Sequence, residues 1–409
     1  MPQRLSIFTG IGSLILGISL IQLANGYVGT LIGIRLGLEH VEPTVAGLVT
    51  SAYFAGYATS ALLCHRLIER TGHIRAFAAF AALVAAAFLV HAIYFDPIVW
   101  TVLRMIAGFG CAGLYVATES WLNVKATPET RGKVFAIYMV ATYTTFAGGQ
   151  FALTLASPTS FTLFAVAAIL FCVALVLVCT TRAEQPVPIA NIRLKTGELA
   201  LAAPVAVAGC FTAGLINGAF FGLVPVYAEL NGLSVPEIAT YMALAITGGL
   251  LLQIPIGRLS DQFDRRLVAG FAALIFAALA LLIVPTRHNP IFPIIWFLLG
   301  GFMGVIYPVN IAHANDRMPS ERAVSVSGRM ILIFGIGSAC GPLLGSGMMS
   351  YLGIQGLFYF MAAVTSLLAV YALIRGFSIR PPTSKRRRAF LLLQPIVAQD
   401  QAQAPDQVR

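Results

Sequence analysis

The sequence has few charged side chains. Lysine, arginine, aspartate and glutamate make up 10% of its 409 residues, whereas 58% are hydrophobic. A soluble domain usually carries about 25% charged residues. A soluble chain this poor in charge could not cover its surface with polar groups, so we expect lipid around the protein. The length leaves room for about twelve helical spans of roughly 20 residues each.

Motifs for metal binding, direct use of ATP and catalysis are also missing. The six cysteines lie singly in apolar runs, without metal-ligand spacing, and we interpret them as small packing residues. They are Cys64, Cys111, Cys172, Cys179, Cys210 and Cys340. The chain has no glycine-rich phosphate-binding loop, and His91 and His313 are not part of a catalytic cluster. We therefore expect no metal, no cofactor and no enzymatic activity.

Long apolar runs, separated by short polar or Pro/Gly loops, predict twelve transmembrane helices. The first run is too long for a signal peptide and is predicted to be retained. The runs cover residues 5–34, 44–64, 74–95, 98–121, 133–156, 159–181, 200–228, 237–257, 267–285, 290–313, 326–349 and 354–375.

The basic residues predict the orientation in the membrane. Of the 26 lysines and arginines, 23 lie at the N-terminus, in every second loop or in the C-terminal tail. Positive residues mark cytoplasmic loops, so both termini of this multi-pass protein are predicted to be cytoplasmic. This distribution accounts for the net charge of +10 as a topology signal rather than a nucleic-acid surface.

Four features recur in the same order at an offset of about 192 residues. An acidic residue follows spans two and eight, Tyr115 and Tyr307 lie in spans four and ten, Asn123 and Asn315 follow, and loops with Pro, Glu and Arg come next. The repeat predicts two six-helix bundles.

The predicted domain boundaries follow from this repeat. The bundles are 1–181 and 200–375, joined by a cytoplasmic linker at 182–199. The tail 376–409 contains KRRR followed by FLLL, which could lie on anionic lipids. The remainder of the tail is predicted to be disordered.

The sequence resembles the major facilitator superfamily over nearly its whole length. The loop GRLSDQFDRR (257–266) is close to a loop signature of that superfamily, whereas its first-half counterpart HRLIERTGHIR (65–75) departs from it. Arg104, Gly108 and Gly110 resemble the fourth-helix signature. ESWLN (119–123) with ANDR (314–317) is similar to a small, poorly characterised bacterial subgroup of these permeases.

This resemblance implies a major facilitator fold and transport by alternating access. Two bundles would be related by a pseudo-two-fold axis along the membrane normal, with a substrate site between them near the midplane. The expected localisation is the bacterial inner membrane, and the expected partners are a small-molecule substrate and protons or another coupling ion. We expect a monomer.

Two loops are candidates for gating. Their carboxylates could accept backbone N–H groups or arginines in one state and lose them in the other. The alternative is solvated charges that only set the topology. The candidates are Glu69, Arg70, Gly72, Gly257, Asp261, Arg265 and Arg266.

Four residues are candidates for coupling. Arg104 lies inside a span, where a charge costs about 2.5–3.5 kcal/mol unless it is paired or hydrated. It is predicted to act in coupling or in binding an anion, and the alternative is snorkelling to the interface. Glu119 could carry a proton with His313 or Arg329 as partner, or it could only bond the cytoplasmic loop.

Polar and aromatic residues in the spans are candidates for the substrate cavity, because amides and phenols in lipid need partners or water. Taken singly, each could instead make a helix–helix hydrogen bond. The candidates are Gln22, Asn25, Tyr53, Tyr57, Tyr143, Gln150, Asn217, Tyr227, Gln253, Tyr307 and Asn310.

The predicted function is secondary active transport of a small organic solute, linked to protons, with a slight preference for a polar metabolite. One alternative is efflux of drugs or other xenobiotics by proton antiport, which an aromatic cavity would suit. Another is a membrane receptor or scaffold that does not transport. The sequence leaves the substrate, the direction and the coupling ion open.

Overall fold

The computed structural model describes residues 2–126, 130–180, 196–286, 289–319 and 322–378, and every regular element in these parts of the chain is a helix. The first half contains α1 (Pro2–Leu38), α2 (Pro43–Thr71), α3 (His73–Ile93), α4 (Pro97–Lys125), α5 (Arg131–Gly149), the short 3₁₀ helix η1 (Gln150–Leu155) and α6 (Phe161–Cys179). The second half contains α7 (Thr196–Ala202), α8 (Pro204–Leu230), α9 (Val235–Gln262), α10 (Arg265–Ile283), α11 (Phe292–Arg317), α12 (Ala323–Leu352) and α13 (Gly356–Ser378).

The long helices agree with the predicted spans. Eleven of them are long and apolar enough to cross a membrane. The twelfth, α5, is rich in threonine and glycine and passes into η1, which makes it less apolar. It packs between α1 and α9, with Thr142 buried. The predicted twelve-helix, all-α membrane fold is confirmed.

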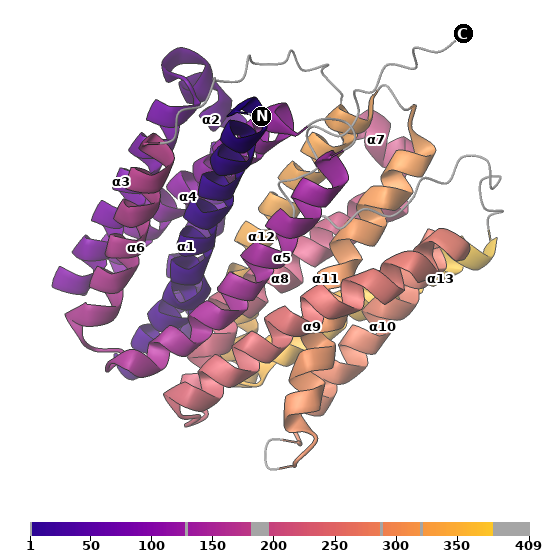
Figure 1. Cartoon of the computed structure of the whole chain (residues 1–409). Coiled ribbons are helices and arrows are strands. Elements are labelled where there is room, and N and C mark those ends of the chain that lie inside the picture. Colours follow the sequence, from indigo (N-terminus) through magenta and orange to yellow (C-terminus); the bar gives the residue numbers. More distant parts are fainter. Residues whose placement is uncertain (1, 127–129, 181–195, 287–288, 320–321, 379–409) are drawn as a thin grey trace, which may run out of the picture.

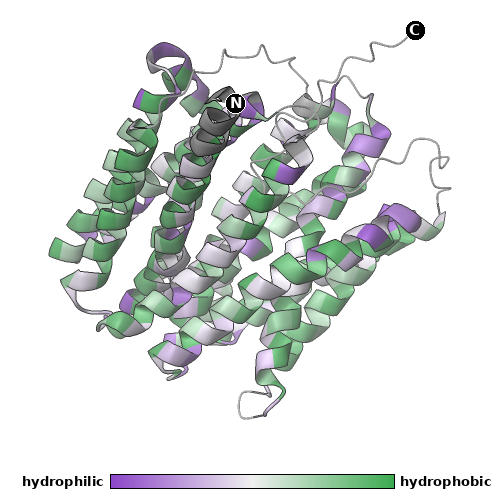
Figure 2. Ribbon diagram, in the orientation of Figure 1, coloured by the Kyte–Doolittle hydropathy of each residue, from purple (hydrophilic) through white to green (hydrophobic). Residues whose placement is uncertain are grey.

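The outer surface of the bundle suits a lipid environment. Figure 2 shows hydrophobic residues along the lengths of the helices and hydrophilic ones mainly near helix ends. Large apolar side chains such as Ile98 and Leu367 are 76% and 72% exposed. In water such exposure would favour aggregation, whereas in a bilayer these side chains face hydrocarbon.

The two halves are built on the same helix crossings. In the first half, a Cβ on Gly56 of α2 would collide with the carbonyl oxygen of Met105, so only glycine permits the observed approach of α4. In the second half, a Cβ on Gly248 of α9 would likewise collide with the carbonyl oxygen of Phe297 on α11. Gly56 and Gly248 are 192 residues apart, which is the offset that the sequence repeat predicts. Small residues of this kind allow close packing of membrane helices.

The halves contact each other across α2 and α12, α1 and α8, and α5 with η1 and α9 (Figure 1). Near the start of α2, the hydroxyls of Thr44 and Ser350 are 3.1 Å apart. The Ser51 hydroxyl, seven residues further along α2, donates to the carbonyl oxygen of Ala339. A Cβ on Gly37, at the end of α1, would touch Glu229 of α8. The halves are therefore joined at the end that carries the loops 39–42, 231–234 and 353–355.

The predicted domain boundaries fall close to gaps in the described chain. Most of the linker, and the tail from residue 379 onward, lie outside the described residues. The last four residues of the predicted linker, 196–199, lie in the short helix α7. The predicted boundaries stay predictions.

Candidate functional site

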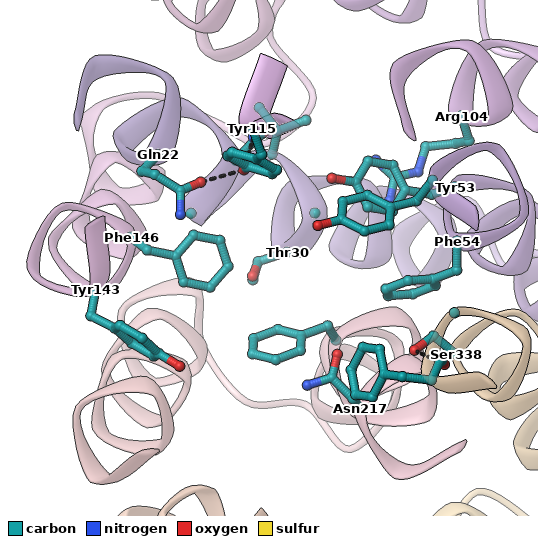
Figure 3. Close-up of a pocket in the computed structure, with 18 residues that line it drawn as sticks. Gln22, Thr30, Tyr53, Phe54, Arg104, Tyr115, Tyr143, Phe146, Asn217 and Ser338 are labelled. Atoms are coloured by element: carbon teal, nitrogen blue, oxygen red, sulfur yellow. Dashed lines mark hydrogen bonds between the residues drawn. The ribbon is translucent and has the colours of Figure 1, made fainter. Parts of the chain in front are cut away.

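A cavity of about 220 Å³ lies between the two halves (Figure 3). Residues from α1, α2, α4 and α5 form one wall, and residues from α8 and α12 form the other. The lining residues are Gln22, Asn25, Gly26, Val28, Gly29, Thr30, Tyr53, Phe54, Tyr57, Arg104, Tyr115, Tyr143, Phe146, Asn217, Phe221, Phe334, Gly335 and Ser338.

Equivalent positions of the repeat face each other across this cavity. Asn25 and Asn217 are 192 residues apart and both line it, and the same offset relates Phe146 to Ser338. Each half thus contributes the same stretch of its first helix and of its fifth. A site between pseudo-symmetric halves is where transporters of this architecture bind their solutes.

Tyr115 organises the polar side chains of the first wall. The amide of Asn25 donates to the Tyr115 hydroxyl at 2.9 Å, and that hydroxyl donates in turn to Gln22 (Figure 3). The Cys111 thiol donates to the Asn25 side-chain oxygen at 3.5 Å. These bonds fix the orientation of the amides, so the wall presents a defined set of donors and acceptors to a bound solute.

Aromatic rings close the rest of the cavity. Phe146 of α5 and Phe221 of α8 meet edge to face across the two halves, with centroids 5.8 Å apart. Phe54 and Phe334 add further apolar surface. The cavity therefore combines an amide and phenol wall with an apolar one, a composition typical of small-molecule sites.

Arg104 is the one charged residue among the eighteen that line the cavity. Its side chain points toward Tyr53 (Figure 3), and its guanidinium carbon lies 4.1 Å from the centre of that ring. Arg104 is 6% exposed, and its Nε has no hydrogen-bond partner. A cation over an aromatic face gains up to about 2 kcal/mol when desolvated, which offsets only part of the cost of burial.

A close crossing of α2 and α4 positions Arg104. A Cβ on Gly108 would collide with the carbonyl oxygen of Tyr53, so glycine here lets α4 approach the backbone that carries this ring. Arg104 precedes Gly108 by four residues and lies one helical turn away on the same face. The spacing of the fourth-helix motif thus has a packing reason.

Six of the eleven predicted cavity residues line this cavity: Gln22, Asn25, Tyr53, Tyr57, Tyr143 and Asn217. Sequence reasoning did not single out Thr30, Tyr115, Ser338 or the four phenylalanines for this role. Tyr115 was noted only as a mark of the repeat. The signals for Phe54 and Phe146 were their positions one residue after Tyr53 and three residues after Tyr143.

The other five predicted cavity residues lie outside this lining. Gln150 donates to the carbonyl oxygen of Gly26 and accepts from Thr30 at 2.9 Å, so it supports the wall from behind. Tyr227 packs on Phe358, Tyr307 packs on Phe334, Asn310 donates to its own helix at Ile306, and Gln253 is buried on α9.

The coupling candidates occupy separate places. Glu119 is 4% exposed on α4, and the Tyr138 hydroxyl of α5 donates to it at 2.9 Å. His313 is buried on α11, where its charged neighbours are Arg317, Asp264, Arg266 and Arg265. Arg329 lies near the start of α12. Of the four candidates, Arg104 lines the cavity.

Ion pairs connect the gating candidates of the second half. Arg265 is 3% exposed, and it pairs with Asp316 of α11 at 2.8 Å and with Asp261 of α9 at 3.1 Å. Gly257 is buried, and its carbonyl oxygen accepts from the Ser260 hydroxyl. The Arg265 cluster therefore ties the ends of three helices of one half together.

Arg266 forms a second connection at the same end of the second half. It pairs with Asp264 at 2.7 Å and donates to the carbonyl oxygen of Arg375 on α13. Burial favours the neutral form of Asp264, but hydrogen bonds from the Arg266 side chain and backbone outweigh it and lower the pKa of Asp264 below its ordinary value.

The corresponding loop of the first half differs. Glu69 and Arg70 are exposed, and within the described part of the chain neither forms an ion pair. Gly72 has a φ of 84°, a left-handed conformation that favours glycine and lets α3 start directly after α2. His73 occupies the position equivalent to Arg265 and lies 3.1 Å from the Ser120 hydroxyl.

Comparisons with known proteins agree with this architecture. The family model described as Major Facilitator Superfamily matches residues 14–252 and 206–399. An uncharacterized MFS-type transporter YcaD from Escherichia fergusonii is 30% identical over 375 residues, which cover 91% of this chain and 97% of the relative. A YcaD from Shigella flexneri is 29% identical over 365 residues, covering 89% and 94%.

Solved transporter structures share the fold. The nucleoside transporter NupG, as a D323A mutant, superposes with a TM-score of 0.75 at 13% identity, covering 90% of this chain and 99% of that one. A bacterial homolog of the human lysosomal transporter Spinster, inward-facing and unoccupied, gives a TM-score of 0.74 at 15% identity, covering 93% and 98%. With two bundles related by a repeat and a cavity between them, this chain belongs to the major facilitator superfamily and is a membrane transporter.

Proposed function

We propose that the protein is a secondary active transporter that moves one small organic solute across the bacterial inner membrane by alternating access. The observation that carries this proposal is the cavity between the halves, which is lined by both of them at equivalent positions such as Asn25 and Asn217. A site shared by two rigid bodies can change its accessible side when one body rocks against the other.

The arrangement of the halves fits an inward-facing state. Contacts such as Thr44 with Ser350 join the halves at the end opposite the predicted cytoplasmic loops. The distribution of basic residues predicts that this joined end is periplasmic. The similarity to an inward-facing Spinster homolog supports the same assignment.

The proposal predicts a second state with the opposite contacts. Spin labels at Glu42→Cys and Tyr351→Cys would report the joined end, and labels at Lys133→Cys and Phe263→Cys the other, in a background lacking the native cysteines. All four positions are exposed. The distances within each pair are measured in nanodiscs while the pH or the solute is varied. We expect conditions that lengthen the distance between labels 42 and 351 to shorten the distance between labels 133 and 263. Fixed distances for both pairs under every condition would favour the receptor or scaffold alternative.

The gating proposal rests on Asp261 and Arg265. The Asp261 side chain is 34% exposed, whereas that of Asp316 is 4% exposed. A partly exposed ion pair contributes about 1 kcal/mol or less, so Asp261→Asn should leave thermal stability nearly unchanged. If Asp261 gates, the same variant nevertheless shifts the populations of the two spin-label distances.

Asp316→Asn is the matched variant. It removes the buried partner of Arg265 and should lower stability by up to about 3 kcal/mol. A purely topological role predicts that Asp261→Asn changes neither the melting temperature nor the distance populations.

We further propose that transport is linked to protons through Glu119. A buried carboxylate that accepts a hydrogen bond from Tyr138 can change its protonation when the cavity changes sides. The expected direction is uptake or exchange of a polar metabolite, which the amides and phenols of the cavity suit.

Efflux of xenobiotics is the second candidate. The phenylalanine wall formed by Phe54, Phe146, Phe221 and Phe334 favours it. The positive charge of Arg104 opposes lipophilic cations, because a second buried cation would lack a counter-ion. Thermal-shift screening against metabolites and drug-like cations separates the two candidates, since a ligand at 100 times its Kd adds about 2.7 kcal/mol to the folded state.

A further inference from the structure

We propose that the transported solute is a small organic monoanion, whose carboxylate or equivalent acidic group pairs with Arg104 while its apolar body lies against the aromatic wall. This inference rests on the proposed transport function and names the class of substrate for the same cavity.

The first observation is the charge of the cavity. Arg104 is 94% shielded from solvent and is the one charged group among the lining residues. Within the described residues it forms no ion pair, its buried Nε has no hydrogen-bond partner, and its guanidinium carbon lies 4.1 Å from the centre of the Tyr53 ring. A buried cation without a counter-ion destabilises the protein that carries it. An anion entering the cavity would remove this penalty, whereas a neutral or cationic solute would not.

The second observation is that the helix crossing does not require an arginine. The second half builds the same crossing, because a Cβ on Gly300 would collide with Ala245, as one on Gly108 would collide with Tyr53. The position equivalent to Arg104, 192 residues further on, is Trp296. Trp296 is 1% exposed and stacks on Tyr241 with ring centroids 5.8 Å apart. An uncharged aromatic side chain therefore satisfies the packing at this position, and the charge of Arg104 needs another reason.

The third observation is the arrangement of the remaining walls. The planar guanidinium fork matches a carboxylate with two parallel donors. Figure 3 shows Asn217 and Ser338 on the wall opposite Arg104, with Phe54 near Tyr53 and Phe146 at the far end beside Gln22 and Tyr143. A volume of about 220 Å³ lies below the usual range of about 300–1,000 Å³ for ligand pockets. The site therefore suits a compact acid with one charge, because a second charge would lack a partner.

Matched probes of equal shape test the charge of the solute. The melting temperature of the purified protein in nanodiscs is measured with benzoate, phenylacetate and hexanoate, with the corresponding amides, and with benzylamine and hexylamine. We expect a saturable rise in melting temperature with at least one acid. The corresponding amide and the amines should need at least a tenfold higher concentration to give the same rise.

Substitutions at Arg104 test the residue. In Arg104→Gln the acid response should weaken at least tenfold, and in Arg104→Lys it should be intermediate, because the charge remains but the fork is lost. Arg75→Gln is the control, because it removes an exposed charge near the start of α3, and its acid response should equal that of the unmodified protein. Asn217→Asp should also abolish the response, by supplying Arg104 with a counter-ion from the opposite wall.

The ligand-free protein gives an independent readout. If Arg104 is kept for an anion, Arg104→Gln should melt at the same temperature as the unmodified protein or a few degrees above it. A structural arginine predicts a lower melting temperature for both Arg104→Gln and Arg104→Lys.

Three results would overturn the inference: no acid stabilises the protein, the amides act as well as the acids, or Arg104→Gln responds to acids undiminished. If the spin labels still report two states in any of these cases, transport stands and only the substrate class fails. If the labels report one state, the transport proposal fails as well.

Discussion

Arg104 and Trp296 occupy equivalent positions in two copies of one helix crossing, yet one faces a cavity as a cation and the other fills a core as an apolar ring. Tyr53 and Ala245 are also equivalent, and of the two only Tyr53 lines the cavity. Most of the polar side chains that line the cavity therefore come from the first half. At the scale of residues, equivalent positions of the two halves therefore share the same backbone contacts but carry side chains of different polarity and charge.

Glu119 carries the coupling prediction at this scale. In Glu119→Gln, exchange of labelled solute across proteoliposomes should persist, while accumulation driven by a pH gradient should fall at least tenfold, because the amide cannot take up a proton. Tyr138→Phe is the matched control. It removes the hydrogen bond to Glu119 but keeps the carboxylate, so accumulation should persist with a shifted pH dependence. Unchanged accumulation in Glu119→Gln would assign this residue a structural role.

Asp264 gives a prediction on pH. Its pKa is lowered in the folded protein, so its ion pair with Arg266 contributes fully above the unfolded pKa of about 4 and is lost as the pH falls through the folded pKa. Asp264→Asn should therefore cost about 1–2 kcal/mol at pH 7, because asparagine can still cap α10 but leaves Arg266 without its charged partner.

The pH dependence of that difference is the test. Melting temperatures of the two proteins should differ by a constant amount between pH 8 and about pH 5 and should converge below about pH 4. A difference that stays constant down to pH 3 would contradict an ionic role for Asp264.

At the scale of elements, glycine pairs decide how closely the helices pack. Gly108→Ala should destabilise the protein by about 1–3 kcal/mol, because the added methyl group would push α4 away from α2 at Tyr53. It should also weaken solute binding, since Arg104 moves with α4. Gly300→Ala places the same methyl group in the second-half crossing, away from Arg104, and should lower stability without the specific loss of binding.

Gly148→Ala provides the control for the intrinsic effect of alanine. A Cβ at Gly148 has no neighbour within 4 Å among the described residues, so the substitution should be neutral or stabilising by up to about 1 kcal/mol. Melting temperatures and ligand titrations of the three variants separate packing from helix propensity. Equal effects at Gly108 and Gly148 would contradict the crossing argument.

At the scale of the whole molecule, the sequence predicts the fold well because hydropathy runs and a repeat are read along the chain. The cavity is harder to predict, because it depends on which side of each helix meets the other half. Tyr115 and Tyr307 are equivalent in sequence, but one lines the cavity and the other packs on Phe334. Asn310 and Gln150 show why polar type alone misleads, since the side-chain amides of both donate to backbone carbonyl oxygens of helices and neither lines the cavity.

The phenylalanines of the cavity could not be predicted from the sequence. An apolar ring that faces a solute and one that faces lipid look alike in a sequence, so Phe221 and Phe334 gave no signal. The charge of Arg104 was the informative exception, because a cation inside a span needs a reason. That no carboxylate of the described helices pairs with it is visible only in the packed structure.

The unpaired charge of Arg104 has an electrical consequence for the transport cycle. With a monoanion bound, the cavity is neutral and the membrane voltage does little work on it when its access changes sides. Without a solute, one positive charge stays in the field, and moving a full charge through 100 mV amounts to about 2.3 kcal/mol. The empty carrier should then reorient in a voltage-dependent way, more slowly in the direction that moves the charge against the field, so one-for-one exchange of anions should depend less on voltage than net movement does.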